Sequence, residues 1–318
     1  ALRDFGNFLN AAGGGAFFTD LAMAAMGRSR GGPAKVAVVA SMLFGSVSGS
    51  AVANVVATGV ITIPMMKRGG YRGQQAGAIE AVASTGGQLM PPVMGAAAFL
   101  MAEILQISYA SIALAALVPA ILYYASLFFQ VDLTAARGNL RVPAGERLPQ
   151  LGAVMASGWP FLLPFVVLVY ALFVMNARPE YAAVVATASV LAIGFWRHWR
   201  GTGGFSPRAI PELLREAGLS VVDILMIGAA AGIIIGVMNI SALGFAMTMA
   251  LVGLGTGSLP ALLAIAALTS IVLGMGMPTL GVYLLLATLI APALVEVGIT
   301  PMAAHLFVLY FGMLSMIT

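Results

Sequence analysis

Two short stretches of the sequence place small oxygen-bearing residues beside glycines in apolar surroundings. The first offers hydroxyl and amide side chains, namely Ser46, Ser48, Ser50 and Asn54. The second offers hydroxyls and backbone carbonyls just before a double proline, namely Ser84, Thr85, Gly86, Gly87 and Met90. Glycine lets the backbone turn its carbonyls inward, and Pro91-Pro92 lacks N–H donors, which frees upstream carbonyls. Oxygen ligands of these kinds suit a hard cation such as sodium without a large buried charge.

Other polar residues in the apolar segments are candidates for substrate contact or for coupling. The amides of Asn54 and Gln88 can hydrogen-bond a substrate carboxylate, and helix N-termini inside a membrane favour an anion. Glu80 lies shortly before the second stretch, and a carboxylate in a membrane segment is a functional candidate by default, here for coupling or for support of the break. The structural alternative is that the Ser and Gly residues only allow close packing between helices.

The composition is that of a membrane protein. The chain has 318 residues, of which 61% are hydrophobic and 8% are charged, and its mean hydropathy is +1.02. Soluble domains carry about 25% charged residues. We therefore predict an all-α polytopic membrane protein and exclude a disulfide scaffold and an ordinary cytosolic enzyme. The chain has no cysteine and lacks the H-E-x-x-H and phosphate-loop motifs, so the sequence favours no enzyme activity.

The lengths of the apolar segments predict helical hairpins and a broken helix. A simple span needs roughly 20 apolar residues. Segments at about 34–66 and 259–294 are too long for one span and too short for two, and Gly-rich interruptions begin at Gly45 and Gly274. We predict two re-entrant hairpins and a broken helix at about 74–104, because lipid cannot satisfy backbone groups freed by proline and glycine. Simpler spans are predicted at about 108–129, 157–176, 180–199, 219–238, 240–256 and 301–317, with polar loops at 130–150 and 197–218. Ser206-Pro207 is a candidate start of a short amphipathic helix in the second loop.

The two halves of the chain resemble one another. Pro64 in the first half corresponds to Pro292 in the second, and Gly70 corresponds to Gly298 at the same offset. If the hairpins open to opposite faces, thirteen of the fifteen Lys and Arg residues fall on one face, which the positive-inside rule makes cytoplasmic. This pattern predicts an inverted repeat, as in secondary transporters. The predicted parts are a first repeat at 1–129, loops and two spans at 130–218, and a second repeat at 219–318.

Three stretches resemble the large membrane subunit of tripartite ATP-independent periplasmic (TRAP) transporters, namely Gly45–Pro64, Lys67–Tyr71 (KRGGY) and Gly77–Glu103. They are most similar to the fused-permease branch that works with TAXI-type binding proteins, and Gly274–Leu286 resembles a second family signature. The resemblance implies an elevator-type, sodium-coupled importer of the ion-transporter superfamily in a bacterial or archaeal cytoplasmic membrane. It also implies a periplasmic TAXI-type binding protein, a small membrane subunit fused in the full-length chain, and a small organic anion as substrate.

The same resemblance implies two sodium sites. The tip of the first hairpin and the facing break form one site. The second site uses Gly274, Gly276, Met277, Pro278 and Thr279, completed by residues beyond Thr318, because the family pattern continues there into a Pro-Pro break. We expect sodium as the coupling ion and no other metal or cofactor. The sequence begins without Met and stops inside an apolar stretch, so we expect a fragment truncated at both ends.

Two other functions fit part of the sequence. A divalent-anion/sodium symporter of similar architecture needs no binding protein, so a strict requirement for a periplasmic partner separates it from a TRAP permease. An ion channel would also be apolar and polytopic, but hairpins and broken helices in an inverted repeat favour alternating access. The basic residues are scattered over several loops, which indicates membrane topology rather than binding of nucleic acid.

Overall fold

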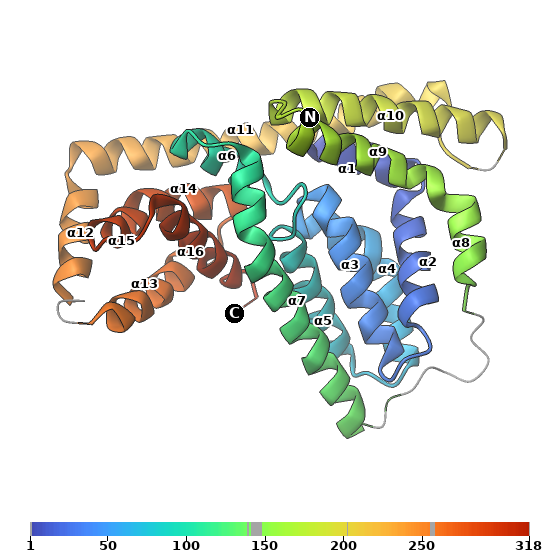
Figure 1. The fold of residues 1–318 in the computed structure, drawn as a ribbon, viewed down its shortest axis with the longest axis horizontal. Helices are drawn as coiled ribbons and strands as arrows, with labels where there is room; N and C mark the ends of the chain where they lie inside the picture. The colour runs from blue at the N-terminus through green and yellow to red at the C-terminus, as the bar shows by residue number, and fades with distance from the viewer. Residues whose placement is uncertain (1, 139, 141–147, 202, 255–257, 318) are drawn as a thin grey trace. The chain divides into compact units, whose positions relative to one another are not determined.

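The computed structural model describes residues 2–138, 140, 148–201, 203–254 and 258–317, and every regular element within them is helical (Figure 1). The all-α prediction is therefore confirmed for this part of the chain. The chain forms two compact units. Unit 1 comprises Ala1–Gly95 and Ser108–Ala217, and unit 2 comprises Ala96–Ile107 and Gly218–Thr318. Two basic residues counted in the predicted topology, Arg141 and Arg147, lie outside the described residues.

The first predicted hairpin consists of α3 (Gly32–Ser48) and α4 (Ala51–Arg68), which pack against each other (Figure 1). Gly49 and Ser50 form the turn. Gly49 has a φ of 60°, which favours glycine, and the Ser50 hydroxyl caps α4 by accepting from the Ala53 amide at 3.3 Å. The interruption is shorter than predicted, because α3 stays helical through Gly45, which packs closely against another helix.

The predicted broken helix has its break at the double proline. Helix α5 (Gly73–Gly87) ends just before it, residues 88–95 are not helical, and α6 (Ala96–Leu105) follows. The Gly95 amide donates to the Gln88 carbonyl at 2.8 Å, which closes the break into a loop. The structure groups α6 with unit 2, where it packs against α14 and α16, whereas the sequence analysis assigned this segment to the first repeat.

The remaining helices of unit 1 include its longest apolar elements. They are α1 (Leu2–Ala11), α2 (Gly14–Met26), α7 (Tyr109–Gly138), α8 (Leu151–Gly158), η1 (Trp159–Phe161), α9 (Leu162–Val169), η2 (Tyr170–Val174), α10 (Pro179–Trp199) and η3 (Pro207–Ala209). Among the described residues, three helical stretches are long and apolar enough to cross a membrane: Tyr109–Gly138, Leu151–Val174 and Pro179–Trp199. A bent pair, Leu225–Met238 with Leu243–Ala250, counts as a fourth if it forms one span.

Two boundaries in the polar segments differ from the prediction. The loop predicted at 130–150 begins later, because α7 remains helical to Gly138. A helix can extend beyond the hydrocarbon core, where polar residues meet water or headgroups. The short helix predicted after Ser206 is a single turn of 3-10 helix, η3, which runs directly into the long helix α11 (Ile210–Ile240).

Unit 2 contains the second predicted hairpin. Its further helices are α12 (Leu243–Leu254), α13 (Leu259–Gly274), α14 (Thr279–Leu289), α15 (Ala291–Glu296) and α16 (Pro301–Leu314). Helices α13 and α14 are joined by residues 275–278, where Gly276 has a φ of 75°. The chain bends again between α14 and α15, directly before Pro292. A proline in a helix interior removes a backbone hydrogen bond, which accounts for this bend.

The helix boundaries recur at the offset that relates Pro64 to Pro292. At this offset, the first and last residues of α4 coincide with the first residue of α14 and the last residue of α15, and α5 and α16 begin at equivalent positions. Gly70 and Gly298 both have a φ of 92° after the equivalent helices. A Cβ on Gly45 in unit 1 would lie 2.6 Å from the Gly87 Cα, and one on Gly274 in unit 2 would lie 2.5 Å from the Ser315 hydroxyl. The two units therefore share element order, turn conformation and a close helix crossing.

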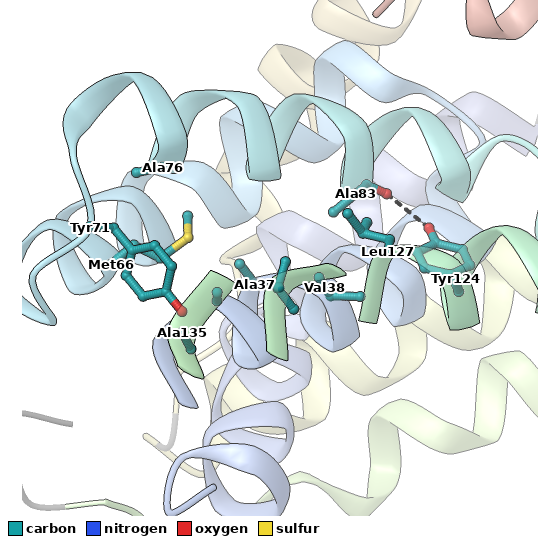
Figure 2. Close-up of a cluster of buried hydrophobic side chains, with 11 residues drawn as sticks. Ala37, Val38, Met66, Tyr71, Ala76, Ala83, Tyr124, Leu127 and Ala135 are labelled. Atoms are coloured by element: carbon teal, nitrogen blue, oxygen red, sulfur yellow. Dashed lines mark hydrogen bonds between the residues drawn. The ribbon is translucent and has the colours of Figure 1, made fainter. Parts of the chain in front are cut away.

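A cluster of buried apolar side chains holds the first hairpin against α5 and α7 (Figure 2). It consists of Ala34, Ala37, Val38, Met66, Tyr71, Ala76, Ala83, Tyr124, Leu127, Val131 and Ala135. Nearly half of these residues are alanines, whose small side chains allow helices to approach closely. Figure 2 also shows the Tyr124 hydroxyl donating to the Ala83 carbonyl of α5, at 2.8 Å. This core fixes the positions of the tip and the break described next.

Candidate functional site

The tip of the first hairpin lies against the break after α5. The Val93 amide donates to the Ser46 carbonyl at 3.1 Å, which joins the two elements through their backbones. Gly49 at the tip approaches the other side so closely that a Cβ there would collide with the Met94 carbonyl oxygen. We call this the tip–break contact, defined by residues 46–50 and 85–95. The structure therefore brings together the two oxygen-rich stretches that the sequence analysis singled out.

Glycines also allow the helices behind this contact to touch. A Cβ on Gly87 would lie 2.5 Å from the Gly45 Cα, so α3 and α5 cross with their backbones in contact. A Cβ on Gly86 would collide with the Tyr123 ring of α7. Gly86 and Gly87 are both buried, so their side of the contact is closed by packing. Met90 is partly buried at the start of the break.

The hydroxyls at the tip–break contact differ in their partners. The Ser46 hydroxyl donates to the Leu43 carbonyl at 2.9 Å, and the Thr85 hydroxyl donates to the Ala81 carbonyl at 2.9 Å. The Ser50 hydroxyl caps α4. The Ser48 hydroxyl is buried and has no hydrogen-bond partner among the described residues. A buried polar group normally finds a partner, so Ser48 is the buried hydroxyl at this contact whose hydrogen-bonding capacity is unused in the described structure.

Two predicted ligands, Asn54 and Ser84, direct their side chains away from the tip. The Asn54 amide donates to the Ser41 carbonyl at 2.8 Å and to the Ser84 carbonyl at 3.5 Å. The Ser84 hydroxyl donates to the Glu80 carboxyl group at 3.2 Å. Gln88 is buried in the break, and its side-chain oxygen lies beside Gly95. Gln88 thus remains at the contact, whereas Asn54 and Ser84 belong to a second polar group.

This second group surrounds Glu80, which is completely buried between α3, α4 and α5. We call it the Glu80 cluster, and its members are Ser41, Asn54, Thr58, Thr62, Glu80 and Ser84. The sequence analysis identified Glu80 but missed Ser41, Thr58 and Thr62. A usable signal was present, because Asn54, Thr58 and Thr62 recur every fourth residue and therefore share one face of α4.

Tyrosines of α7 satisfy backbone carbonyls along α5 and the break. The Tyr109 hydroxyl lies 2.8 Å from the Pro92 carbonyl oxygen and 2.6 Å from that of Val93. The Tyr123 hydroxyl donates to the Val82 carbonyl at 2.8 Å. Irregular backbone at membrane depth is tolerated where protein satisfies its polar groups. These tyrosines, which the sequence analysis did not single out, supply that satisfaction on the α7 side of the break.

An ion-pair group lies at the other end of the hairpin. The Lys35 ammonium is 2.6 Å from an Asp132 carboxylate oxygen and 4.9 Å from the centre of the Phe128 ring, and Arg30 pairs with the same carboxylate. Burial, together with the nearby Asp132 charge, raises the pKa of Tyr71 to about 12. This group connects the start of α3 to α7 and carries one more positive than negative charge.

The predicted residues of the second ion site all lie at the α13–α14 turn. Gly274 ends α13, Gly276 provides the left-handed turn, and Thr279 begins α14. Met277 and Pro278 line an apolar pocket within unit 2, together with Ile227, Ile234, Gly281 and Leu285. No group of three His, Asp or Glu side chains suited to a metal ion occurs within the described residues. A cation at this turn would therefore depend on backbone carbonyls and hydroxyls.

Comparison with known proteins gives one family across nearly the whole chain. Residues 5–318 match the family model described as "Tripartite ATP-independent periplasmic transporter, DctM component". A putative TRAP transporter large permease protein of Haemophilus influenzae is 26% identical over 310 residues, which cover 97% of this chain and 69% of the relative. The C4-dicarboxylate TRAP transporter large permease protein DctM of Vibrio cholerae is 28% identical over 315 residues, with 93% and 68% covered.

A third relative is an uncharacterized protein, y4mL, of Sinorhizobium fredii. It is 34% identical over 176 residues, which cover 55% of this chain and 41% of the relative. The chain thus spans between 41% and 69% of the length of these three relatives.

Proposed function

Because the chain belongs to the DctM family of TRAP transporters, we propose that it is the core of a membrane permease that imports a small organic anion. It works with a periplasmic binding protein and a small membrane subunit. Transport, rather than catalysis, is the activity of the family it matches. The apolar helices long enough to cross a membrane support a multi-pass protein of the cytoplasmic membrane.

The proposed coupling ion is sodium, and the observation that carries this proposal is the tip–break contact. Ser48 is buried there without a hydrogen-bond partner in the described structure, beside a break whose two prolines have no backbone N–H to donate. The proposed ligands are Ser48 and Ser50 with carbonyls from Ser46, Thr85, Gly86, Gly87 and Met90. Asn54 and Ser84 serve the neighbouring Glu80 cluster. The second sodium site is proposed at Gly274, Gly276, Met277, Pro278 and Thr279.

The proposed substrate is a small carboxylate. The Vibrio cholerae relative is named for C4-dicarboxylates, and Gln88 remains at the contact as a hydrogen-bond donor for such a group. The recurring helix boundaries support a repeat, which we propose is inverted, with re-entrant hairpins and elevator-type movement. We also propose that the binding protein is of the TAXI type and that the small subunit is fused to this subunit in the full-length chain.

The proposal is tested by uptake into vesicles that contain the full-length protein. A radiolabelled C4-dicarboxylate is added with and without the binding protein, under an inward gradient of sodium or of potassium. We expect uptake only with the binding protein and the sodium gradient. Sodium-driven uptake without the binding protein would favour the divalent-anion symporter instead. Equal uptake with either cation would contradict sodium coupling.

A further inference from the structure

The Glu80 carboxyl group connects three helices through hydrogen bonds to hydroxyls. Ser41 of α3, Thr58 of α4 and Ser84 of α5 approach the same carboxyl oxygen, Oε1, at 3.0, 2.6 and 3.2 Å. Thr62 of α4 approaches the other oxygen, Oε2, at 2.5 Å. All these side chains are fully buried, with 0% exposure. Hydrogen bonds are directional, so a cluster that shares one acceptor fixes the relative positions of the helices that contribute to it.

The Glu80 cluster is linked directly to the tip–break contact through Asn54. The Thr58 hydroxyl lies 2.8 Å from the Asn54 carbonyl oxygen, and the Asn54 amide joins the carbonyls of Ser41 and Ser84. The Asn54 side chain also borders the crossing of α3 and α5, because a Cβ on Gly45 would lie 2.6 Å from its amide nitrogen. Gly45 lies one helical turn before the tip, and Gly87 is the last residue of α5 before the break. The cluster therefore lies directly behind the contact.

The second repeat shows that the architecture does not need this cluster. At the offset that relates Pro64 to Pro292, five of its members correspond to apolar residues or glycine: Asn54 to Val282, Thr58 to Leu286, Thr62 to Ile290, Glu80 to Val308, and Ser84 to Gly312. These residues are buried in unit 2, where a Cβ on Gly312 would lie 2.6 Å from Val282 and 2.8 Å from Leu286. The same helix packing is thus made once with hydrogen bonds and once without them.

We propose that Glu80 is a positioning residue for the first ion site. Its carboxyl group holds α3, α4 and α5 in the arrangement that keeps the hairpin tip against the break, so the oxygens there are preorganised for the cation. This inference rests on the proposed sodium site. It assigns to Glu80 a role through its hydrogen bonds, rather than direct contact with the ion or carriage of a proton.

Glutamine distinguishes these roles, because its shape matches glutamate. Its side-chain oxygen can accept from Ser41, Thr58 and Ser84. Its amide can donate to Thr62, whose own proton then goes to the Thr58 carbonyl, 3.0 Å away. Glu80→Gln therefore preserves positioning, whereas it removes the charge and the exchangeable proton. Glu80→Ala removes all the bonds, and Thr58→Val removes one of them with little change in shape.

The experiment measures two quantities on the full-length protein. The first is the apparent sodium affinity, from the rise in melting temperature with sodium at constant ionic strength. The second is hydrogen exchange in the peptide that contains Val93, whose amide bonds to the tip, measured without sodium. We expect Glu80→Ala to lower the sodium affinity about 10- to 100-fold, as loss of a group supporting a metal ligand does, and to speed exchange. Thr58→Val should lower the sodium affinity and speed the exchange to a smaller extent. Glu80→Gln should resemble the unmodified protein in both quantities.

The control is Glu103→Gln on α6, which removes an exposed carboxylate and should change neither quantity. Unchanged affinity and exchange in Glu80→Ala would overturn the proposal. It would also be overturned if Glu80→Gln lost sodium binding while exchange at Val93 stayed slow, because the charge or proton would then act directly. If the unmodified protein showed no sodium-specific stabilisation, the proposed coupling ion would be wrong, and the exchange measurement would still decide whether Glu80 positions the contact.

Discussion

At the scale of single residues, the site depends on positions where any side chain would be too large. Gly49 has a left-handed conformation and lies against the Met94 carbonyl, and Gly45 and Gly87 bring two helix backbones into contact. Glycine is costly in a helix because it loses more conformational freedom than other residues on folding. Its presence at a crossing therefore indicates that close approach matters more there than helix propensity.

Gly87→Ala tests this requirement. The added methyl would lie 2.5 Å from the Gly45 Cα, so α3 and α5 must separate. We expect a loss of about 1–3 kcal/mol in the free energy of unfolding, as for other overpacked cores, and a weaker sodium effect on stability.

Gly77→Ala is the matched control, because it lies in the same helix and a Cβ there meets nothing within 4 Å. It should leave stability equal or raise it by up to about 1 kcal/mol. Chemical denaturation of the purified protein measures both changes. Equal effects of the two substitutions would contradict the account of the crossing.

At the scale of elements, the hairpin is held at both ends. The tip is held by the break and the Glu80 cluster, and the base is held by Asp132 of α7, which pairs with Lys35 and Arg30. The two cations differ in environment, because the side chain of Lys35 is 9% exposed and that of Arg30 is 57% exposed. A buried charge that loses its partner is costly, whereas an exposed ion pair contributes little.

Asp132→Asn should therefore lower the denaturation midpoint clearly, because Lys35 would be left buried without a counter-charge. Arg30→Gln removes the exposed cation from the same carboxylate and should lower the midpoint much less. Denaturation midpoints of the two variants, measured side by side, check this difference. A loss in Arg30→Gln as large as that in Asp132→Asn would show that the buried pair does not hold the hairpin base.

Sequence patterns predicted the elements better than the contacts between them. Apolar length, glycine and proline predicted the turns that join α3 to α4 and α13 to α14, and the break after α5, because these residues change backbone geometry locally. They did not reveal that α3 continues through Gly45, since a glycine that ends a helix and one that lets helices cross look alike in sequence. Ser41, Thr58 and Thr62 were missed for a similar reason. A Ser or Thr in an apolar helix bonds its own backbone as readily as a distant carboxyl group.

At the scale of the whole molecule, the two units build the same element order with different chemistry. Unit 1 places a polar cluster behind its hairpin tip, and unit 2 has buried Val282, Leu286, Ile290 and Val308 at the corresponding positions. In the sequence, only a few glycines and prolines at a fixed offset indicated that these helix boundaries recur. The difference between polar residues in unit 1 and apolar residues in unit 2 could not be recognised from sequence alone, because the helix boundaries are needed to decide which positions correspond.

The central claim is that the tip–break contact of unit 1 binds sodium. The most direct measurement is the melting temperature of the full-length protein in sodium, potassium and choline chloride at equal ionic strength. A ligand at 100 times its dissociation constant adds about 2.7 kcal/mol to the stability of the folded state. We predict a rise specific to sodium that is lost in Ser48→Ala and kept in Ser157→Ala, which removes an exposed hydroxyl from α8. The same melting temperature in all three salts, or a sodium effect unchanged in Ser48→Ala, would contradict the claim.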